Sequence, residues 1–195
     1  MLSVPALTLL LVSFAFAAPQ AEGGEICAPI GWPNPWTADY DDLPFTELPP
    51  TPVGTYRGLT YDLFYVNTDE NLIAEVSPPN HAISFDCTKP RTISVENPGE
   101  SFDLQSLYVA CSSGFPQDDC HIKLRGIKKR GGHVERKIIY PKLENPTPFK
   151  MLKVDFGGGW KDLTSLDFTS VEIDGTCNYT GLMIDSLTYK KKKCI

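Results

Sequence analysis

The chain has little that is typical of a helical protein or of a common enzyme class. No window of about twelve residues places apolar residues at helical spacing without a glycine, a proline or a β-branched cluster. Only 3 of the 195 residues are histidine, and no G-x-S-x-G, H-E-x-x-H or glycine-rich phosphate loop occurs. These absences argue against a helical fold, and they give no support to hydrolase, metalloprotease or nucleotide-binding chemistry.

Long apolar runs are equally scarce. Leu7 to Phe16 form an uncharged apolar stretch near the start of the chain. The small residues Ala15 and Ala17 predict signal-peptide cleavage before Ala18. No later run reaches the roughly 18 residues that a membrane-spanning helix needs. We therefore expect a secreted protein without a membrane span, either extracellular or associated with a cell wall.

Short alternating runs between turn residues make up the rest of the chain. The 17 prolines and 15 glycines separate these runs, as loops require. The pattern predicts an all-β protein, an antiparallel β-sandwich of the jelly-roll type. We expect a signal peptide (1–17), an N-terminal arm (18–36) and a single domain (37–195). The predicted strands are 56–67, 82–87, 92–96, 102–111, 121–128, 134–140, 149–156, 163–173 and 181–189.

The 6 cysteines predict three disulfides in a secreted chain. Cys111 ends one predicted strand and Cys120 begins the next, so a disulfide between them would close the neck of a hairpin. The remaining four cysteines allow three arrangements. No C-x-x-C pair is present, which disfavours a zinc site. Because the termini of sandwich proteins often lie close together, the favoured arrangement is Cys27–Cys194 with Cys87–Cys177.

The chain has one N-glycosylation sequon that is open to transfer. It begins at Asn178, in a predicted turn between two strands. Asn97 and Asn145 are each followed by proline, which excludes them as acceptors. We therefore expect a glycan at Asn178, although the neighbouring Cys177 can hinder its transfer.

The formal net charge of −6 hides a strong segregation of charge. Residues 22–47 hold six acidic residues and no basic one, whereas residues 121–153 hold ten basic residues and two acidic ones. Lys128, Lys129 and Arg130 stand at a predicted hairpin turn. Such a hairpin can hold an acidic polysaccharide, a phosphorylated surface or an anionic lipid headgroup, or it can be a solvated edge that blocks aggregation. Nucleic acid is not an expected partner of a secreted chain that is acidic overall.

A set of short motifs, in their order and spacing, gives the chain a resemblance to a known type of protein. They resemble small secreted fungal proteins with a galactose-binding-like β-sandwich, similar to carbohydrate-binding modules. The resemblance covers about residues 37–189 and implies this architecture first and function second. The motifs are Tyr40-Asp41-Asp42-Leu43, the run from Tyr56 to Val66, Ser101 to Tyr108, Leu163 to Phe168 and Leu182 to Leu187.

The resemblance also implies a metal. In carbohydrate-binding relatives an early aromatic-acidic pair and a late apolar-apolar-Asp motif share a structural calcium ion, and the matching residues here are Asp41 and Asp185. Calcium takes six to eight oxygen ligands, of which backbone carbonyls can supply several. We therefore expect one structural calcium ion; the alternative is that both residues are ordinary turn or surface carboxylates.

Exposed aromatic rings are the other expected feature, since sugar-binding modules stack them on pyranose faces. Trp160 follows three glycines and is a candidate, although its spacing from Leu163 is typical of a core residue. Tyr65, Tyr108 and Tyr179 are further candidates.

Three functional hypotheses follow. The first is a non-catalytic protein that binds a cell-wall or host glycan. The second is a secreted effector or interaction protein that engages a protein or an anionic surface through the basic hairpin. The third, which the sequence favours least, is a carbohydrate-active enzyme.

Overall fold

The computed structural model describes residues 27–30, 35–46, 49–68, 80–84, 89–112, 119–141, 151–173 and 181–194, without the side chains of residues 112 and 169–173. The signal-peptide prediction, Cys87, Cys177, Asn178 and Tyr179 lie outside these residues. Every strand pairing in the described part is antiparallel, and no helix there is long and apolar enough to cross a membrane. The strands are β1 (Cys27–Pro29), β2 (Trp36–Ala38), β3 (Pro52–Tyr56), β4 (Leu59–Thr68), β5 (Asn80–Ser84), β6 (Arg91–Val95), β7 (Glu100–Ser112), β8 (Cys120–Lys128), β9 (His133–Tyr140), β10 (Leu152–Asp155), β11 (Leu163–Ile173) and β12 (Gly181–Cys194).

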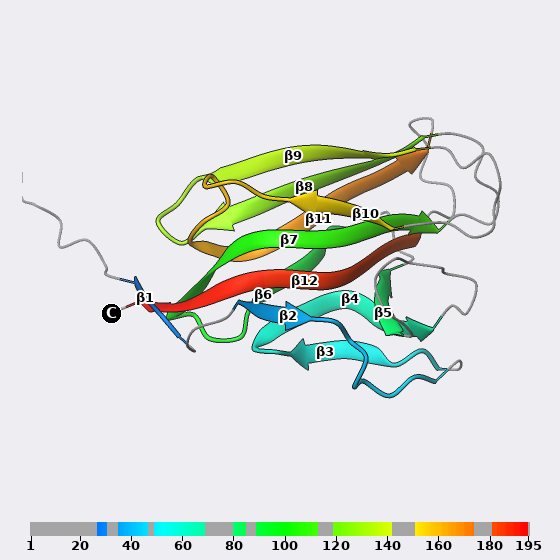
Figure 1. Ribbon diagram of the computed structural model, residues 1–195, viewed down its shortest axis with the longest axis horizontal. Helices are drawn as coiled ribbons and strands as arrows, with labels where there is room; N and C mark the ends of the chain where they lie inside the picture. Colours follow the sequence, from blue (N-terminus) through cyan, green and yellow to red (C-terminus); the bar gives the residue numbers. More distant parts are fainter. Residues whose placement is uncertain are drawn as a thin grey trace, which may run out of the picture.

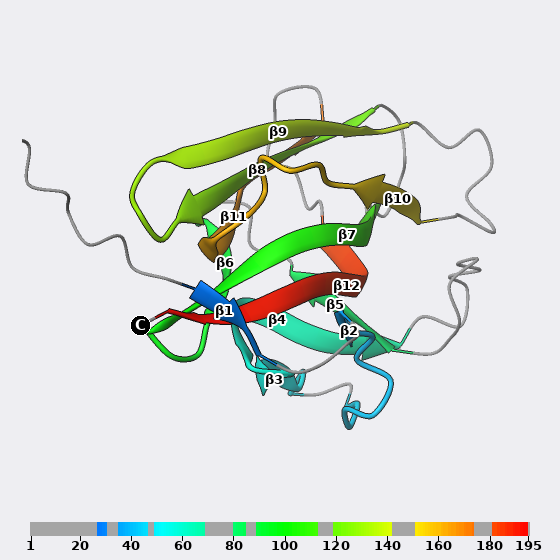
Figure 2. The same cartoon turned by 60° about the vertical axis from the view of Figure 1, so that its left-hand side comes forward.

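Six of the strands close into a ring. Hydrogen-bonded neighbours run β7-β12-β5-β4-β6-β11, and the pairing of Leu163 with Phe102 joins β11 back to β7. Beyond the ring, β8 and β9 extend from β11, and β10 extends from β7 (Figures 1 and 2). β9 and β10 are therefore the two ends of the strand order.

The expectation of an all-β, antiparallel protein is confirmed. The finer expectation of two separate sheets packed as a sandwich is not met, because the strand order forms one closed ring with extensions. The ring depends on the contact between β7 and β11, whose paired residues are distant in sequence. A strand pattern read from sequence gives the faces of each strand but not such a long-range pairing.

A bulge in β4 reverses the expected orientation of its side chains. In the sequence Leu59, Tyr61, Leu63 and Tyr65 alternate with other residues, and a regular strand would place all four on one face. Leu63 instead has a left-handed φ of 61°, and the register with β3 shifts in this region. An extra residue in a strand turns the following side chains to the other face. Leu59, Tyr61, Phe64 and Val66 are therefore buried, and Tyr65 is half-buried.

Aromatic pairs fill the interior of the ring. Phe64 packs edge-to-face on Phe168 with ring centroids 5.7 Å apart, and Phe102 packs in the same way on Tyr189 at 5.9 Å. Edge-to-face contacts add a modest stabilisation beyond the buried area. Phe102 and Tyr189 lie on the neighbouring strands β7 and β12, and Phe64 and Phe168 lie on β4 and β11, which β6 separates.

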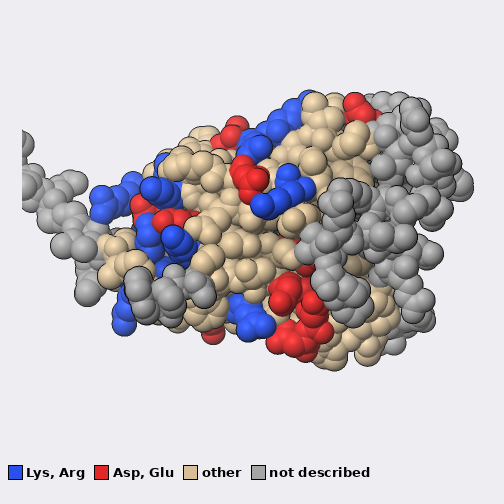
Figure 3. All heavy atoms as spheres, in the orientation of Figure 1, with Lys and Arg blue, Asp and Glu red and all other residues tan. Residues whose placement is uncertain are grey.

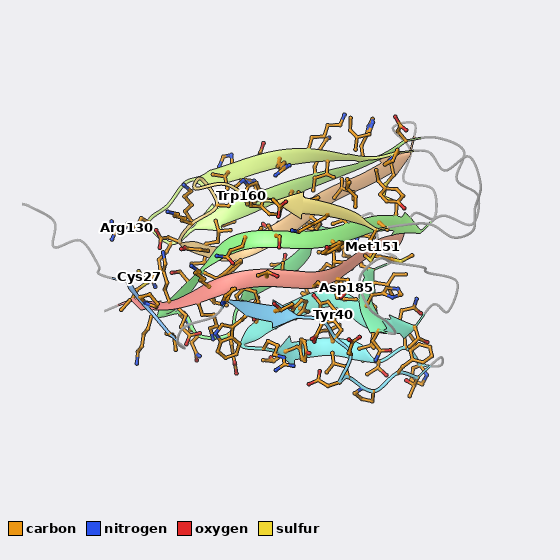
Figure 4. The ribbon with its side chains drawn as sticks, viewed as in Figure 1. Cys27, Tyr40, Arg130, Met151, Trp160 and Asp185 are labelled. Carbon is orange, nitrogen blue, oxygen red and sulfur yellow. A yellow bond between two sulfur atoms is a disulfide. The ribbon has the colours of Figure 1, made fainter. Side chains whose placement is uncertain are left out.

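The two disulfides of the described residues are Cys27–Cys194 and Cys111–Cys120, the pairings favoured from the sequence. The first lies where β1 pairs with the end of β12, and Figure 4 shows Cys27 beside that end of the sheet. The lysine run Lys190–Lys193 belongs to β12. Lys191 pairs with Glu100 at 2.8 Å, and Lys192 pairs with Asp103 at 2.8 Å.

Candidate functional site

The strands β8 and β9 form a hairpin with one buried face and one outer face. Cys120, Ile122, Leu124, Ile138 and Tyr140 are buried. Alternate side chains therefore point outward, as the period of two in a strand requires. We call this outer set the basic face: His121, Lys123, Arg125, His133, Glu135, Lys137 and Ile139.

Two lysines are directly opposite each other on the basic face. The register pairs Lys123 with Lys137, and both residues are exposed. Like charges in a cross-strand pair destabilise a sheet. The adjacent pair is complementary, since the Arg125 Nε lies 3.8 Å from the Glu135 Oε1. The register therefore places the carboxylate of this face opposite Arg125 rather than opposite a lysine.

A shallow hollow of about 310 Å³ lies at this lysine pair. It is lined by Lys123, Leu124, Glu135, Arg136 and Lys137. The side chain of Leu124 is buried, so this residue contributes main chain to the floor. A hollow with two ammonium groups and one carboxylate at its sides can hold an anion and bond hydroxyl groups at the same time.

The tip of the hairpin presents less charge than the sequence suggests. Lys128 and Lys129 are half-buried. The Lys129 ammonium donates a hydrogen bond to the Pro98 carbonyl at 2.8 Å. Arg130 is exposed, and Figure 4 shows it at the outer end of the hairpin. Of the three predicted tip residues, Arg130 is therefore the most accessible to a ligand.

Trp160 is wrong as a stacking platform, because its side chain is only 8% exposed. Its ring packs against Phe156 with centroids 4.8 Å apart. It also lies over Gly126, where an added Cβ would come within 3.1 Å of the indole. Gly126 therefore leaves space for Trp160 inside the protein, and Figure 4 shows Trp160 between the β8–β9 hairpin and β7.

Tyr65 and Tyr108 are half-buried and pack against the core. Tyr65 pairs with Ile83 of β5, and Tyr108 pairs with Asp185 of β12. These two rings lie on different strands, and the hollow at the lysine pair includes neither of them. The structure does not bring the predicted aromatic residues together into one platform.

Four aspartates gather near the start of the domain, and we call them the acidic cluster: Asp39, Asp41, Asp42 and Asp185. The Tyr56 hydroxyl lies 2.5 Å from Asp42 and 2.9 Å from Asp39, and it donates its proton to these two carboxylates. The Arg57 guanidinium lies 3.4 Å from the Asp42 Oδ2. Figure 3 shows acidic atoms together at the lower edge of the molecule and basic atoms along its upper edge, over β9.

Asp185 is the buried member of this cluster. The register of β12 shifts between Asp185 and Thr188, and Ser186 has a left-handed φ of 45°. This bulge accompanies the burial of five consecutive residues, of which Asp185 is the last. Burial, above all, raises the pKa of Asp185 to about 7; the charges of Asp41 and Asp39 contribute to this rise, and the hydrogen bond from the Ser186 N–H opposes it.

The cluster fits the expected calcium ion in part. Asp41 and Asp185 are close enough that the charge of Asp41 acts on the pKa of Asp185. Each already accepts a backbone hydrogen bond, from Asn80 at 3.4 Å and from Ser186 at 2.6 Å. In the part of the chain that the structure describes, no group of three or more His, Cys, Asp or Glu side chains could hold a metal. Carbonyl and water oxygens would have to complete the shell.

The sequence interpretation named the hairpin tip and missed the lysine pair along the strands. The signal for this pair is present in the sequence. In a hairpin whose turn is centred on Arg130, residues that are equally far from Arg130 in sequence lie opposite each other. Lys123 and Lys137 are such a pair. A turn centred on the two glycines that follow Arg130 gives a different register, in which these lysines do not face each other.

The comparisons with known proteins are sparse. No family model and no curated protein matches the chain. Among solved structures, a carbohydrate-binding module of family 22 from Clostridium thermocellum Xyn10B is similar, with 11% identity and a TM-score of 0.41 over 72% of this chain and 90% of that one. The enzymatically active domain of tailspike protein 4 from bacteriophage CBA120 is also similar, with 11% identity and a TM-score of 0.29 over 71% of this chain and 19% of that one.

Proposed function

We propose that this protein is a non-catalytic, secreted binding protein for an acidic polysaccharide, which it holds on the basic face of the β8–β9 hairpin. The observation that carries the proposal is the Lys123–Lys137 pair at the edge of a hollow. Two ammonium groups that face each other repel, and such a like-charged pair disfavours the pairing of the two strands. An anion between them would turn the repulsion into two charge-assisted hydrogen bonds.

The remaining groups of the basic face suit a glycan better than a bare anion. Glu135 and Arg125 flank the lysine pair, and their side chains can accept and donate hydrogen bonds to sugar hydroxyls. Ile139 is 50% exposed on the same face and offers an apolar contact to a pyranose ring. A uronic acid unit combines a carboxylate, hydroxyls and an apolar ring face, so it uses all three kinds of group.

Secretion belongs to the same proposal. Disulfides form and persist mainly in oxidising compartments, and two are present in the described residues. The effector hypothesis, in which the basic face engages a protein or an anionic lipid surface, stays as the alternative. The titrations below distinguish these partners, because a polysaccharide and an anionic lipid surface are tested in parallel.

Binding is tested by titrating the protein with sodium polygalacturonate, and in parallel with neutral dextran and with vesicles containing an anionic lipid. We expect the protein to bind polygalacturonate, more weakly as salt screens the charges, and not to bind dextran. The double variant Lys123→Thr with Lys137→Thr should lose at least about tenfold in affinity, since hydrogen bonds to charged groups are worth about 1.5–3 kcal/mol each. Facing threonines are favourable in a sheet, so this variant should remain folded.

The matched control is Lys153→Thr with Lys193→Thr, which removes the same charge from exposed positions on β10 and β12. Its affinity for polygalacturonate should stay within about twofold of the parent. Equal losses of affinity in both double variants would mean that binding depends on net charge alone, and this result would overturn the site. Binding to vesicles but not to polygalacturonate would favour the effector hypothesis.

The calcium ion between Asp41 and Asp185 also remains a proposal. A cation there would stabilise both carboxylates in their charged form. Thermal melts near neutral pH, with calcium and with a chelator, test it. A melting temperature that is higher with calcium, and that is no longer raised in Asp41→Asn, would support the ion. Equal melting temperatures in the two conditions would show that no calcium ion stabilises the protein.

A further inference from the structure

A second hollow, of about 220 Å³, lies against β7 and shares no lining residue with the hollow at the lysine pair. It is lined by Asp103, Leu104, Gln105, Phe156, Gly157, Gly158, Lys161 and Lys190. β7 and β12 supply Asp103 and Lys190, and the loop between β10 and β11 supplies the glycines and Lys161. The Arg136 guanidinium lies 5.1 Å from the Phe156 ring centroid and closes this side of the hollow toward β9.

Nothing within the described protein requires glycine at the three glycine positions of this loop. Gly157, Gly158 and Gly159 do not have left-handed φ angles. A Cβ added at Gly157 or Gly159 would meet nothing within 4 Å, and one at Gly158 would make an ordinary contact of 3.9 Å with Lys161. Neither backbone conformation nor packing therefore demands them, in contrast to Gly126 beneath Trp160.

Loop flexibility does not explain the glycines either, because hydrogen bonds hold the loop along its length. The Phe156 N–H donates to the Gln105 carbonyl at 2.7 Å, and the Leu104 N–H donates to the Trp160 carbonyl at 2.9 Å. The Asp162 N–H donates to the Asp103 carboxylate at 2.9 Å. The loop is thus attached to β7 at both ends, and its open glycine backbone faces outward as a fixed surface. Glycine at such a position permits close approach of another molecule.

The charge balance of the hollow is positive. Lys192 lies within 2.9 Å of both Asp103 and Asp162, so one lysine neutralises much of the nearby negative charge. Lys161 and Lys190 are exposed at the rim, and among the described residues no carboxylate forms an ion pair with either. Gln105 adds an amide that can donate and accept hydrogen bonds.

We infer that this glycine-lined hollow is a second binding subsite, which takes one carboxylated sugar unit. Lys161 and Lys190 bind the carboxylate, Gln105 bonds hydroxyls, and the backbone at Gly157 and Gly158 allows the ring to approach closely. The inference rests on the proposed function for its ligand class, and it adds a location that the basic face does not include.

The test follows amide signals by NMR during titration with a short oligogalacturonide. We expect two separate sets of shifts in the parent protein, one on β8–β9 and one at Gln105, Gly157, Gly158 and Lys161. Gly158→Leu should remove the second set and leave the first, because the new side chain fills the hollow. Gly159→Leu is the matched control: it lies next in the chain, is equally open to solvent and does not line the hollow.

A second variant, Lys161→Ala with Lys190→Ala, tests the charges without filling space and should also remove the second set. If both variants keep the shifts of the second set, the subsite is wrong while the proposed function stands. If Lys123→Thr with Lys137→Thr keeps the first set, the basic face is wrong while the subsite stands. The absence of both sets in the parent protein would overturn the two proposals together.

Discussion

In the acidic cluster, Asp39 and Asp42 accept hydrogen bonds from Tyr56 and lie near Arg57, and Asp185 is buried. On the β8–β9 hairpin, Lys123 faces Lys137 across an exposed edge. Asp39 and Asp42 thus have charged and hydrogen-bonding partners within the fold. The basic face leaves like charges opposed at the surface. Hydrogen bonds and ion pairs within the fold stabilise the charges of Asp39 and Asp42, burial disfavours the charge of Asp185, and the like charges of Lys123 and Lys137 disfavour their cross-strand pairing.

The largest expected effect concerns Asp185. Burial raises the pKa of its carboxyl group from 3.8 to about 7, and each unit corresponds to about 1.4 kcal/mol. The folded state therefore holds a proton that the unfolded state releases, so stability falls as pH rises from about 4 to about 7. In chelator-treated protein, Asp185→Asn should raise the free energy of unfolding by up to about 4 kcal/mol at about pH 8 and leave it unchanged at about pH 4.

Denaturant unfolding at the two pH values measures this difference. The amide oxygen of the substituted asparagine would still accept the hydrogen bond from the Ser186 N–H, so the substitution changes charge and little else. An equal change at both pH values would mean that the variant acts through packing rather than through the carboxylate.

The next effect is on the hydrogen bonds of the acidic cluster. Tyr56→Phe removes the hydroxyl that donates to Asp39 and Asp42. Because both carboxylates are partly exposed, the loss should be about 1–2 kcal/mol of unfolding free energy. Affinity for polygalacturonate should not change. A variant that kept full stability would show that these aspartates do not depend on Tyr56.

A single substitution can replace the like-charged pair of the basic face with a pair of opposite charges, as the acidic cluster has between Asp42 and Arg57. Lys137→Glu places a carboxylate opposite Lys123, and a complementary cross-strand pair should add about 0.2–1 kcal/mol of stability. The same change should reduce affinity for polygalacturonate at least about tenfold, or about 1.4 kcal/mol. Stability and binding would then move in opposite directions. A parallel loss of both would indicate that the lysine pair is structural.

The smallest effect concerns Glu135. Glu135→Gln removes the negative charge beside the lysine pair and keeps the ability to bond hydroxyls. We expect affinity for polygalacturonate to rise by about two- to threefold at low salt and by less at high salt. Isothermal titration at the two salt concentrations measures it. A loss of affinity instead would mean that the carboxylate itself bonds the ligand more strongly than it repels it.

Local patterns in the sequence predicted most strands of the described chain, because burial on one face alternates with exposure on the other. They also led to the two disulfides, since Cys111 and Cys120 are close in sequence and Cys27 and Cys194 lie near the ends. Cys111–Cys120 does not close a hairpin as expected, because in the described residues β7 and β8 pair with other strands and not with each other. The closure of β7 onto β11 was missed because it joins strands that are distant in the chain. The bulges at Leu63 and Ser186 were missed because their left-handed backbone is set by the surrounding sheet.

The candidate site was predicted in part. The concentration of basic residues pointed to the hairpin that carries the proposed site, but its tip was favoured over its strands. Trp160 follows three glycines, and this context suggested an exposed loop. Its burial depends on the space left by Gly126, which is more than thirty positions away in the sequence and packs against the indole only after folding.

The most direct test of the account compares Lys123 and Lys137 with Lys153 and Lys193, which belong to neither proposed site, as a polyanion binds. NMR signals of the lysine ammonium or side-chain methylene groups can be followed during titration with sodium polygalacturonate. We predict that Lys123 and Lys137 shift first and furthest, while exposed Lys153 and Lys193 stay near their starting positions. Uniform shifts of all exposed lysines would contradict a built site on the basic face.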